Sequence, residues 1–335
     1  EEELAGPTLE EMIKALGDAS WDGDLDAWPE HLSPSVRRRI TTDQSQCTGR
    51  RCPHIAQCSF FRAREGLEEA DVIVTNHDLV LSDLRLGGGV ILPAPEDSLY
   101  VFDEGHQLPA KCLNQFALRF HSGGTLQGLR DSERWLAASA ENWVAQGLDE
   151  RLIPAMTSLV DDLIQRSEDI AELLWQLLPE ADFERAEHRF PHGRVPVSLA
   201  EQAAGLVAQW DQLYREAARL EAALENSQTA GSSSADSTIA GAADPDLNLA
   251  NAQGLVARAE QQLAVWRAFA DAPGEGEPGD GCARWCQHRG TLQSVECQAS
   301  PILPGELLNE ALWQRAAGAV ITSATLSALG TFERF

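Results

Sequence analysis

The segment that most constrains how this chain folds is residues 99–106, LYVFDEGH, an apolar run that ends in two adjacent carboxylates. A short apolar run bounded by turn formers is typical of a buried strand in a parallel sheet. Side chains that follow such strands lie at the carboxyl edge of the sheet, where open α/β folds bind ligands. A strand that presents Asp103 and Glu104 there is suited to hold a metal ion beside a base. The alternative is a strand that runs into a solvated turn.

Three further apolar runs indicate companion strands, at residues 72–74 (VIV), 90–92 (VIL) and 319–323 (AVITS). Runs of this kind predict a parallel sheet that is covered on both faces. The last run leads into small hydroxyl residues and lies far along the chain from the run at 99–102. Because both runs are expected in one sheet, the segment between them is predicted to be an inserted domain.

The inserted segment has a helical period from residue 123 to residue 225. Apolar stripes at 152–163 and 170–177 predict packed helices. A further seam advances in steps of four and three, at Leu206, Trp210, Leu213, Ala217, Leu220 and Leu224. A second helix has one apolar face, formed by Leu255, Ala259, Leu263 and Trp266. Residues 226–246, rich in Ser, Ala, Gly and Asp, predict a flexible loop that joins these helices as an antiparallel hairpin.

The charge distribution restricts how the chain can contact nucleic acid. A net charge of −26 over 335 residues excludes a protein that coats nucleic acid with its whole surface, because neutralising phosphates requires lysine and arginine. Residues 37–64 differ, since seven arginines against one acid give a net charge of +6. This window predicts a local phosphate contact. The arginines expected to contact phosphate are Arg50, Arg51, Arg62 and Arg64. A solvated basic face that balances the acidic residues 1–30 is the alternative.

Aromatic residues near this basic window are candidates for base stacking, which single-strand-binding grooves use. Trp21 and Trp28 precede the window, and Phe60 and Phe61 lie within it. For the two phenylalanines, we expect a core position rather than a stacking role.

Cysteine usage and hydropathy indicate the compartment. Seven cysteines, an odd number clustered along the chain, suit a reducing compartment and a metal site better than a disulfide framework. No apolar run approaches the length of a membrane span, and the N-terminus has no signal-peptide pattern. We therefore expect a soluble, cytoplasmic protein that does not contact membranes.

Cys47, Cys52 and Cys58 lie within twelve residues, and Gly49 and Pro53 favour a looped backbone that brings their thiols together. Structural zinc sites use four ligands in more closely spaced pairs. An iron-sulfur cluster, zinc and free thiols all remain open from the spacing. The candidates for a fourth ligand are Cys112, His54 and an exogenous thiolate.

The remaining cysteines are expected to be ordinary thiols. Cys112 follows the carboxylate turn and is predicted to be a core or surface thiol. Cys282 and Cys286, with His288 and Cys297 nearby, have a ligand-like spacing. For this group we prefer ordinary thiols to a second metal site.

Four blocks occur in a specific order and cover about a fifth of the chain. They read CTGRRCPHIAQCSFF, ADVIVTNHDLVL, VFDEGHQLP and ASPILPGELLNEALWQRAAGAVITSATLSALGTF. In this order they resemble the iron-sulfur DNA helicases of the XPD-like family, most closely the bacterial DinG/YoaA branch. The chain lacks a G-x-x-x-x-G-K-[ST] phosphate loop, and its only lysines, Lys14 and Lys111, follow no glycine-rich turn. The arginine-bearing motifs of a second motor domain are also missing, so we expect an internal fragment.

The resemblance implies an α/β fold. It consists of a partial RecA-like parallel sheet, an incomplete iron-sulfur cluster domain and an inserted all-helical domain called the arch. The expected boundaries are 1–66 for the cluster domain, 67–122 and 293–335 for the first motor domain, and 123–292 for the arch with its flexible loop 226–246.

The resemblance also implies roles for the site residues. Asp103 would hold the Mg²⁺ of bound ATP, and Glu104 would polarise the attacking water. His106 would link this turn to a coupling segment made of Ser323, Ala324 and Thr325. A capping role for His106 and a helix N-cap for the hydroxyls are the structural alternatives. Gly105 stands where the wider class carries alanine, and no chemical consequence is expected because neither residue has a functional group.

In the complete protein, the resemblance implies that Cys47, Cys52 and Cys58 bind a [4Fe-4S] cluster, with the fourth ligand from upstream. The implied activity is that of an ATP-dependent DNA helicase that translocates 5′ to 3′ on single-stranded DNA during repair. Its partners would be single-stranded and forked DNA, with replication or repair proteins at the arch. The isolated chain is expected to be inactive, because it has no phosphate loop. The alternative is a non-catalytic DNA-binding or protein-interaction module.

Overall fold

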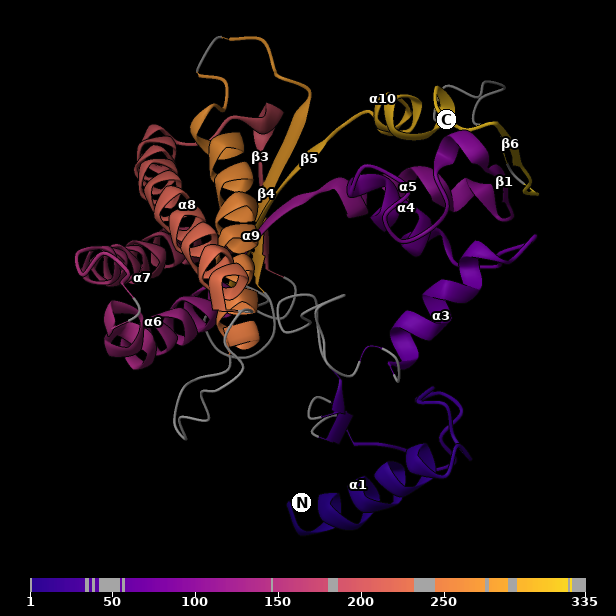
Figure 1. Cartoon of the computed structure of the whole chain (residues 1–335). Coiled ribbons are helices and arrows are strands. Elements are labelled where there is room, and N and C mark those ends of the chain that lie inside the picture. Colours follow the sequence, from indigo (N-terminus) through magenta and orange to yellow (C-terminus); the bar gives the residue numbers. More distant parts are fainter. Residues whose placement is uncertain are drawn as a thin grey trace. The chain divides into compact units, whose positions relative to one another are not determined.

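The computed structural model describes residues 2–33, 36–37, 40–41, 55, 58–145, 147–179, 186–231, 245–274, 277–288, 294–324 and 326. The chain divides into two compact units, Glu1–Ile73 and Val74–Phe335 (Figure 1).

The first unit contains two helices, α1 (Glu2–Gly17) and α3 (Ser59–Glu68). The segment after α1 turns back at Gly23, whose φ is +95°. The Ser59 hydroxyl donates a hydrogen bond to the carbonyl of Asp22, and a Cβ atom on Gly23 would overlap this hydroxyl. Glycine is therefore required at position 23. Trp21 and Trp28 pack edge to face beside this turn, with ring centroids 4.9 Å apart.

The second unit contains the parallel strand pair predicted from the sequence. Strand β1 (Leu99–Phe102) pairs in parallel with β6 (Gly318–Ile321), with Leu99 opposite Gly318 and Phe102 opposite Ile321. The pairing continues beyond the strands, because the Thr322 amide donates to the Phe102 carbonyl over 2.8 Å. The predicted return of the chain to the sheet is confirmed.

Two of the predicted strands are wrong. Residues 72–74 have no regular secondary structure and form no ladder with any described residue, and residues 90–92 form bends. In the second case the backbone amides are already bound by Asp83, a carboxylate that is 1% exposed. Asp83 Oδ1 accepts from the amides of Val90 and Ile91 over 2.9 and 2.5 Å. Amides that donate to a side chain cannot join a strand ladder, and the apolar run becomes a loop.

The expectation of a sheet covered on both faces is also wrong for the part of the chain that is described. Leu99 and Val101 of β1 are 79% and 72% exposed, and Val320 of β6 is 55% exposed. The opposite side of β1 is packed, since Phe102 is buried and contacts Trp313 edge to face. The parallel pair therefore has one packed face and one exposed apolar face.

The prediction of an all-helical insertion is also wrong. A four-stranded antiparallel sheet has the order β2–β5–β4–β3. Its strands are β2 (Leu118–His121), β5 (Val295–Pro301), β4 (Cys282–His288) and β3 (Glu187–Phe190). These strands are short and far apart along the chain, so their alternation of buried and exposed residues gives a weak signal beside long helical stripes.

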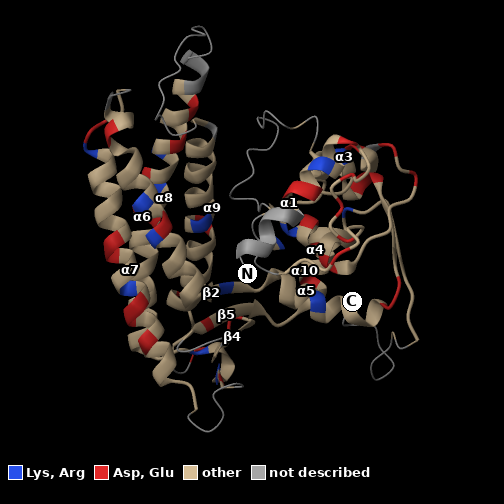
Figure 2. Ribbon diagram, turned by 90° about the horizontal axis from the view of Figure 1, so that it is seen from below, with Lys and Arg blue, Asp and Glu red and all other residues tan. Residues whose placement is uncertain are grey.

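Four long helices pack on this sheet and share one core with it. They are α6 (Ser122–Ala145), α7 (Leu152–Gln176), α8 (Val197–Gly231) and α9 (Pro245–Ala270). The predicted seam of α8 and the apolar face of α9 are buried, and the two helices lie side by side (Figure 1). Helix α8 extends to Gly231, so the predicted loop is helical over 226–231, while residues 232–244 lie outside the described part. Lys/Arg and Asp/Glu positions are interspersed along α6, α7 and α8 (Figure 2).

Short elements connect this domain to the parallel pair. Before β1 come α4 (His77–Arg85) and the 3-10 turn η3 (Pro95–Asp97), and after it come η4 (Gly105–Gln107) and α5 (Leu108–Phe116). The turn η6 (Pro191–Gly193) follows β3. After β5, α10 (Pro304–Leu308) and the π-helical turn η7 (Asn309–Trp313) lead into β6. Within the described residues, no helix has the length and apolar character needed to span a bilayer.

Candidate functional site at the carboxyl edge of β1 and β6

Two polar segments meet where β1 and β6 end. Asp103, Glu104 and His106 follow β1, and Thr322 and Ser323 follow β6. Parallel strands place both segments at the same edge, and the structure joins them directly. The Gly105 amide donates to the Thr322 carbonyl over 2.9 Å. The predicted meeting of the carboxylate pair with the hydroxyl segment is thus found, and Thr325 lies outside the described residues.

Asp103 is held in place by hydrogen bonds to one of its oxygens. Oδ1 accepts from the Thr322 hydroxyl over 2.8 Å and from the Glu104 amide over 3.0 Å. The Thr322 hydrogen bond is the main cause that lowers the pKa of Asp103, followed by the Glu104 amide, while the nearby His77 imidazole contributes a smaller charge interaction. Asp103 is therefore an exposed, ionised carboxylate, and Oδ2 is available as a hard oxygen ligand.

Glu104 and His106 are positioned by a tight turn. Glu104 adopts a left-handed conformation with φ 49° and ψ 41°, which reverses the chain directly after β1. His106 Nδ1 then lies 3.1 Å from Glu104 Oε2 and 2.9 Å from the Ser323 hydroxyl. Because a carboxylate can only accept, Nδ1 carries the hydrogen and Ser323 shares it as an acceptor. One imidazole ring therefore connects the two polar segments.

Gly105 has a packing role that the sequence analysis missed. It is buried, and a Cβ atom at this position would lie 2.1 Å from Cγ2 of Ile321 and 3.4 Å from the carbonyl oxygen of Thr322. The expectation that an alanine here has no chemical consequence concerned functional groups. The structure shows a steric consequence, because glycine allows the turn to approach β6 closely.

The site rests on an aromatic cluster and on helix α4. Phe102 is 3% exposed, and its ring stacks on Tyr100 and meets His77 edge to face at 5.7 Å. Helix α4 begins at His77 because Asn76 caps it, its Oδ1 accepting from the Leu79 amide over 2.8 Å.

The two residues missed by sequence reasoning, Thr322 and His77, come from quoted sequence blocks. Thr322 precedes the predicted hydroxyl segment, and His77 lies in the run TNHDLVL. Their side chains had no assigned role because their proximity to Asp103 depends on the strand pairing.

The cysteine site is only partly described. Cys47 and Cys52 lie outside the described residues, while Cys58 is half-buried and precedes α3. No group of three metal-ligating side chains occurs among the described residues. Cys112 is fully buried, and this burial raises its pKa to about 11, which disfavours the thiolate form that a metal requires.

The other cysteines belong to the core of the antiparallel sheet. Cys286 and Cys297 are buried opposite one another on β4 and β5. Burial raises the pKa of Cys286 to about 12 and that of Cys297 well above its ordinary value. Cys282 is half-buried, and desolvation raises its pKa as well. These thiols fit a structural role.

Only part of the basic window at residues 37–64 is described. Arg62 and Arg64 lie on α3, and Arg50 and Arg51 lie outside the described residues. The expected core position of Phe60 is wrong, since its side chain is 57% exposed. The guanidinium carbon of Arg64 lies 5.7 Å from the centre of the Phe60 ring, within cation–π range.

Comparison with known proteins places these features in context. No family model matches the chain. It is 31% identical over 331 residues to a protein of Photobacterium profundum named ATP-dependent DNA helicase DinG. The aligned region covers 98% of this chain and 45% of that protein. The proteins of the same name from Escherichia coli K12 and Salmonella typhimurium are 27% and 28% identical, each over 94% of this chain and 42% of the relative. The chain thus spans less than half the length of these relatives.

Proposed function

Since this chain is a homologue of the DinG helicases over almost its whole length, we propose that it works as part of an ATP-dependent DNA helicase. The observation that carries the proposal is the parallel pairing of β1 with β6. That pairing unites a carboxylate pair and a hydroxyl segment from distant parts of the sequence. Unwinding DNA with ATP requires such a junction, because the nucleotide site must communicate with a second segment of the motor.

The proposal assigns a separate task to each side chain. Asp103, ionised and held through Oδ1, would bind a nucleotide-associated Mg²⁺ through Oδ2, and this ion would neutralise phosphate charge. Glu104 would accept hydrogen bonding from the attacking water. His106 would transmit changes at Glu104 to Ser323 and the following Ala324 and Thr325, because its Nδ1 contacts both Glu104 and Ser323.

The DNA contact is proposed at the first unit. Arg62 and Arg64 of α3 would bind phosphates together with Arg50 and Arg51, and the exposed Phe60 ring would stack on a base. We extend the proposal to single-stranded and forked DNA as substrates, 5′ to 3′ translocation, a repair role and a cytoplasmic location. These last features come from the family resemblance alone.

The cluster proposal rests on the spacing of the three thiols. Cys47, Cys52 and Cys58 would bind a [4Fe-4S] cluster with a ligand from elsewhere in the protein. The fully buried Cys112 does not favour the thiolate form, because burial raises its pKa to about 11, and His54 lies outside the described residues. The proposed domain organisation keeps residues 1–66 as the cluster domain, 67–122 and 293–335 as motor, and 123–292 as the arch, now with strands as well as helices.

The decisive experiment uses the complete protein that contains this chain. The flanking sequence is determined first, and the expected findings are a phosphate loop, one more cysteine and a second motor domain. DNA-stimulated ATP hydrolysis is then measured for the wild type, for Glu104→Gln and for Glu310→Gln, an exposed acid outside the site. We expect Glu104→Gln to abolish turnover while nucleotide binding persists, and Glu310→Gln to leave it unchanged.

Two results would contradict the proposal. Wild-type ATP hydrolysis by the Glu104→Gln variant would contradict the role assigned to Glu104. Flanking sequence that encodes no motor domain would favour a non-catalytic module that binds DNA or proteins. We also expect this chain by itself to show no DNA-stimulated hydrolysis, because no lysine-bearing phosphate loop is present to hold the β- and γ-phosphates.

A further inference from the structure

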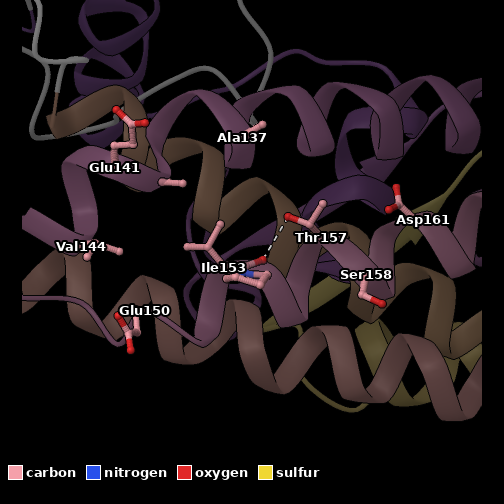
Figure 3. A pocket seen from close by; sticks show the side chains of 10 residues that line it. Ala137, Glu141, Val144, Glu150, Ile153, Thr157, Ser158 and Asp161 are labelled. Atoms are coloured by element: carbon pink, nitrogen blue, oxygen red, sulfur yellow. Dashed lines mark hydrogen bonds between the residues drawn. The ribbon is translucent and has the colours of Figure 1, made fainter.

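An open groove runs between α6 and α7 and has a volume of about 870 Å³ (Figure 3). Its floor is apolar and built mainly from small side chains. These are Ala137, Ala140 and Val144 of α6 and Ile153 and Pro154 of α7. Ala137, Val144 and Pro154 are exposed, with Val144 at 42%, so the groove is an open surface rather than an enclosed cavity. An apolar groove of this shape fits a macromolecular segment better than a small ligand.

The spacing of the lining residues points to a helix as the occupant. On α6 they recur at intervals of three and four residues, and on α7 they do so from Ile153 to Asp161, while Glu150 lies just before this helix. Two helical stripes of small residues form a furrow into which the ridge of a third helix packs. At a rise of 1.5 Å per residue, the α7 side of the groove is about 12 Å long, which accommodates about two helical turns.

The rim of the groove is acidic. Glu141 and Glu150 lie near one end and Asp161 near the other (Figure 3). None of the described residues that line the groove is basic, and within the described part of the chain these three acids form no ion pair. Two other acids of these helices do form ion pairs, since Arg130 binds Glu168 over 2.8 Å and Arg134 binds Asp131. The rim carboxylates are therefore available to cations from a partner.

We propose that this groove, named here the acidic groove, binds an amphipathic helix of a partner protein. The helix would insert small or medium apolar side chains at positions i, i+3, i+4 and i+7, and its flanking Lys or Arg side chains would pair with the rim. The charge pattern argues against nucleic acid and anionic lipid, because both would bring phosphates to a carboxylate rim. The inference goes beyond the helicase proposal and does not depend on it.

The test uses the chain itself and labelled probe peptides of about five helical turns. The probes carry Ala, Val or Leu at the four apolar positions and Lys or Arg at the flanks. A second set has the same apolar residues with Glu at the flanks. Binding is measured by fluorescence anisotropy at several salt concentrations, and circular dichroism verifies the fold of each variant.

Three variants separate the groove from the general acidity of the chain. The rim variant combines Glu141→Lys, Glu150→Lys and Asp161→Lys. The matched control makes the same charge change at exposed acids that do not line the groove, with Asp162→Lys, Glu172→Lys and Glu201→Lys. Ala137→Trp fills the exposed floor without a change in charge.

We expect the rim variant to weaken binding of a basic probe by about tenfold, because three exposed ion pairs are lost, and to bind the Glu-flanked probe better than the wild type does. The control variant should lose much less, and Ala137→Trp should block both probes. Equal losses in the rim and control variants would overturn the proposal in favour of bulk charge. Absence of binding for every probe would overturn it as well. A dimer that Ala137→Trp dissociates in sedimentation would assign the groove to a second copy instead.

Discussion

The Nδ1 atom of His106 lies 2.9 Å from the hydroxyl oxygen of Ser323, although 217 positions of sequence separate the two residues. The contact exists because β1 and β6 are parallel neighbours that end at the same edge. The turn after each strand contributes one partner. A displacement of either turn therefore changes the contacts of the His106 imidazole with the other turn.

The hydroxyl of Thr322 should control the acidity of Asp103. We expect Thr322→Val to raise the pKa of Asp103 toward its ordinary value, because the largest cause of its lowered pKa is removed. Thr322→Ser should retain the low pKa. A carbon-detected NMR titration of the Asp103 carboxyl measures both.

The lowered pKa of Asp103 also determines how this residue makes stability depend on pH. A carboxyl group with a lowered folded-state pKa stabilises the fold above its ordinary pKa, and that contribution is lost as pH falls through the lowered value. Thr322→Val should therefore show less loss of stability in acid than the wild type. An unchanged Asp103 titration in the Val variant would contradict the assigned hydrogen bond.

Gly105 should not tolerate a side chain. Gly105→Ala places a Cβ atom 2.1 Å from Ile321 Cγ2, so we expect a loss of about 1–3 kcal/mol in the free energy of unfolding. The double variant with Ile321→Ala should recover part of the loss caused by the clash, as a double-mutant cycle in chemical denaturation would show. Gly66→Ala, where a Cβ atom meets nothing within 4 Å, is the control. Independent, additive effects at positions 105 and 321 would rule out the steric explanation.

The basic window should determine how single-strand binding depends on salt. Joint replacement of Arg50, Arg51, Arg62 and Arg64 by Ala removes four proposed phosphate contacts. The slope of log K against log salt should then decrease by about 3, since each contact on a single strand contributes about 0.7.

A matched variant replaces four arginines of the helical domain, Arg130, Arg134, Arg215 and Arg219. It should leave this slope unchanged, since these side chains already pair with acids on their own surface. If both quadruple variants reduce the slope equally, the located DNA contact is refuted.

The core thiols should resist alkylation while the protein is folded. Burial raises the pKa of Cys112 to about 11 and that of Cys286 to about 12, so the reactive thiolate is scarce near neutral pH. In protein prepared without a cluster, half-buried Cys58 should react with iodoacetamide before Cys112 and Cys286, as mass spectrometry after digestion would report. Because these pKa values are raised in the fold, stability should decline as pH rises above the ordinary thiol pKa. Rapid modification of Cys286 in the native protein would argue against its buried position.

The sequence predicted what depends on local pattern. The apolar seam from Leu206 to Leu224 and the strands β1 and β6 form as expected, because the spacing of apolar residues along the sequence predicts such elements directly. The run at 90–92 failed as a strand because Asp83, several residues earlier, binds its amides. The antiparallel sheet escaped prediction, since each short strand gains its partners only from distant segments.

The residues of the candidate site also divide into those that local pattern predicts and those that depend on contacts between distant segments. Asp103, Glu104 and His106 were identifiable because they follow a recognisable strand. Thr322 and the steric demand on Gly105 became visible only when β6 was placed beside β1. Tertiary contacts of this kind have no periodic signature in the sequence.

The helical domain leaves and rejoins the rest of its unit through adjacent strands, since Leu118 of β2 lies opposite Ala299 of β5. Both crossings thus occupy one hydrogen-bonded stem. A domain joined to its host in this way can be lengthened, shortened or exchanged beyond the stem without moving the residues that hold Asp103 and Ser323. Evolution can then vary what the outer helices recognise while the chemistry at the strand edge stays intact.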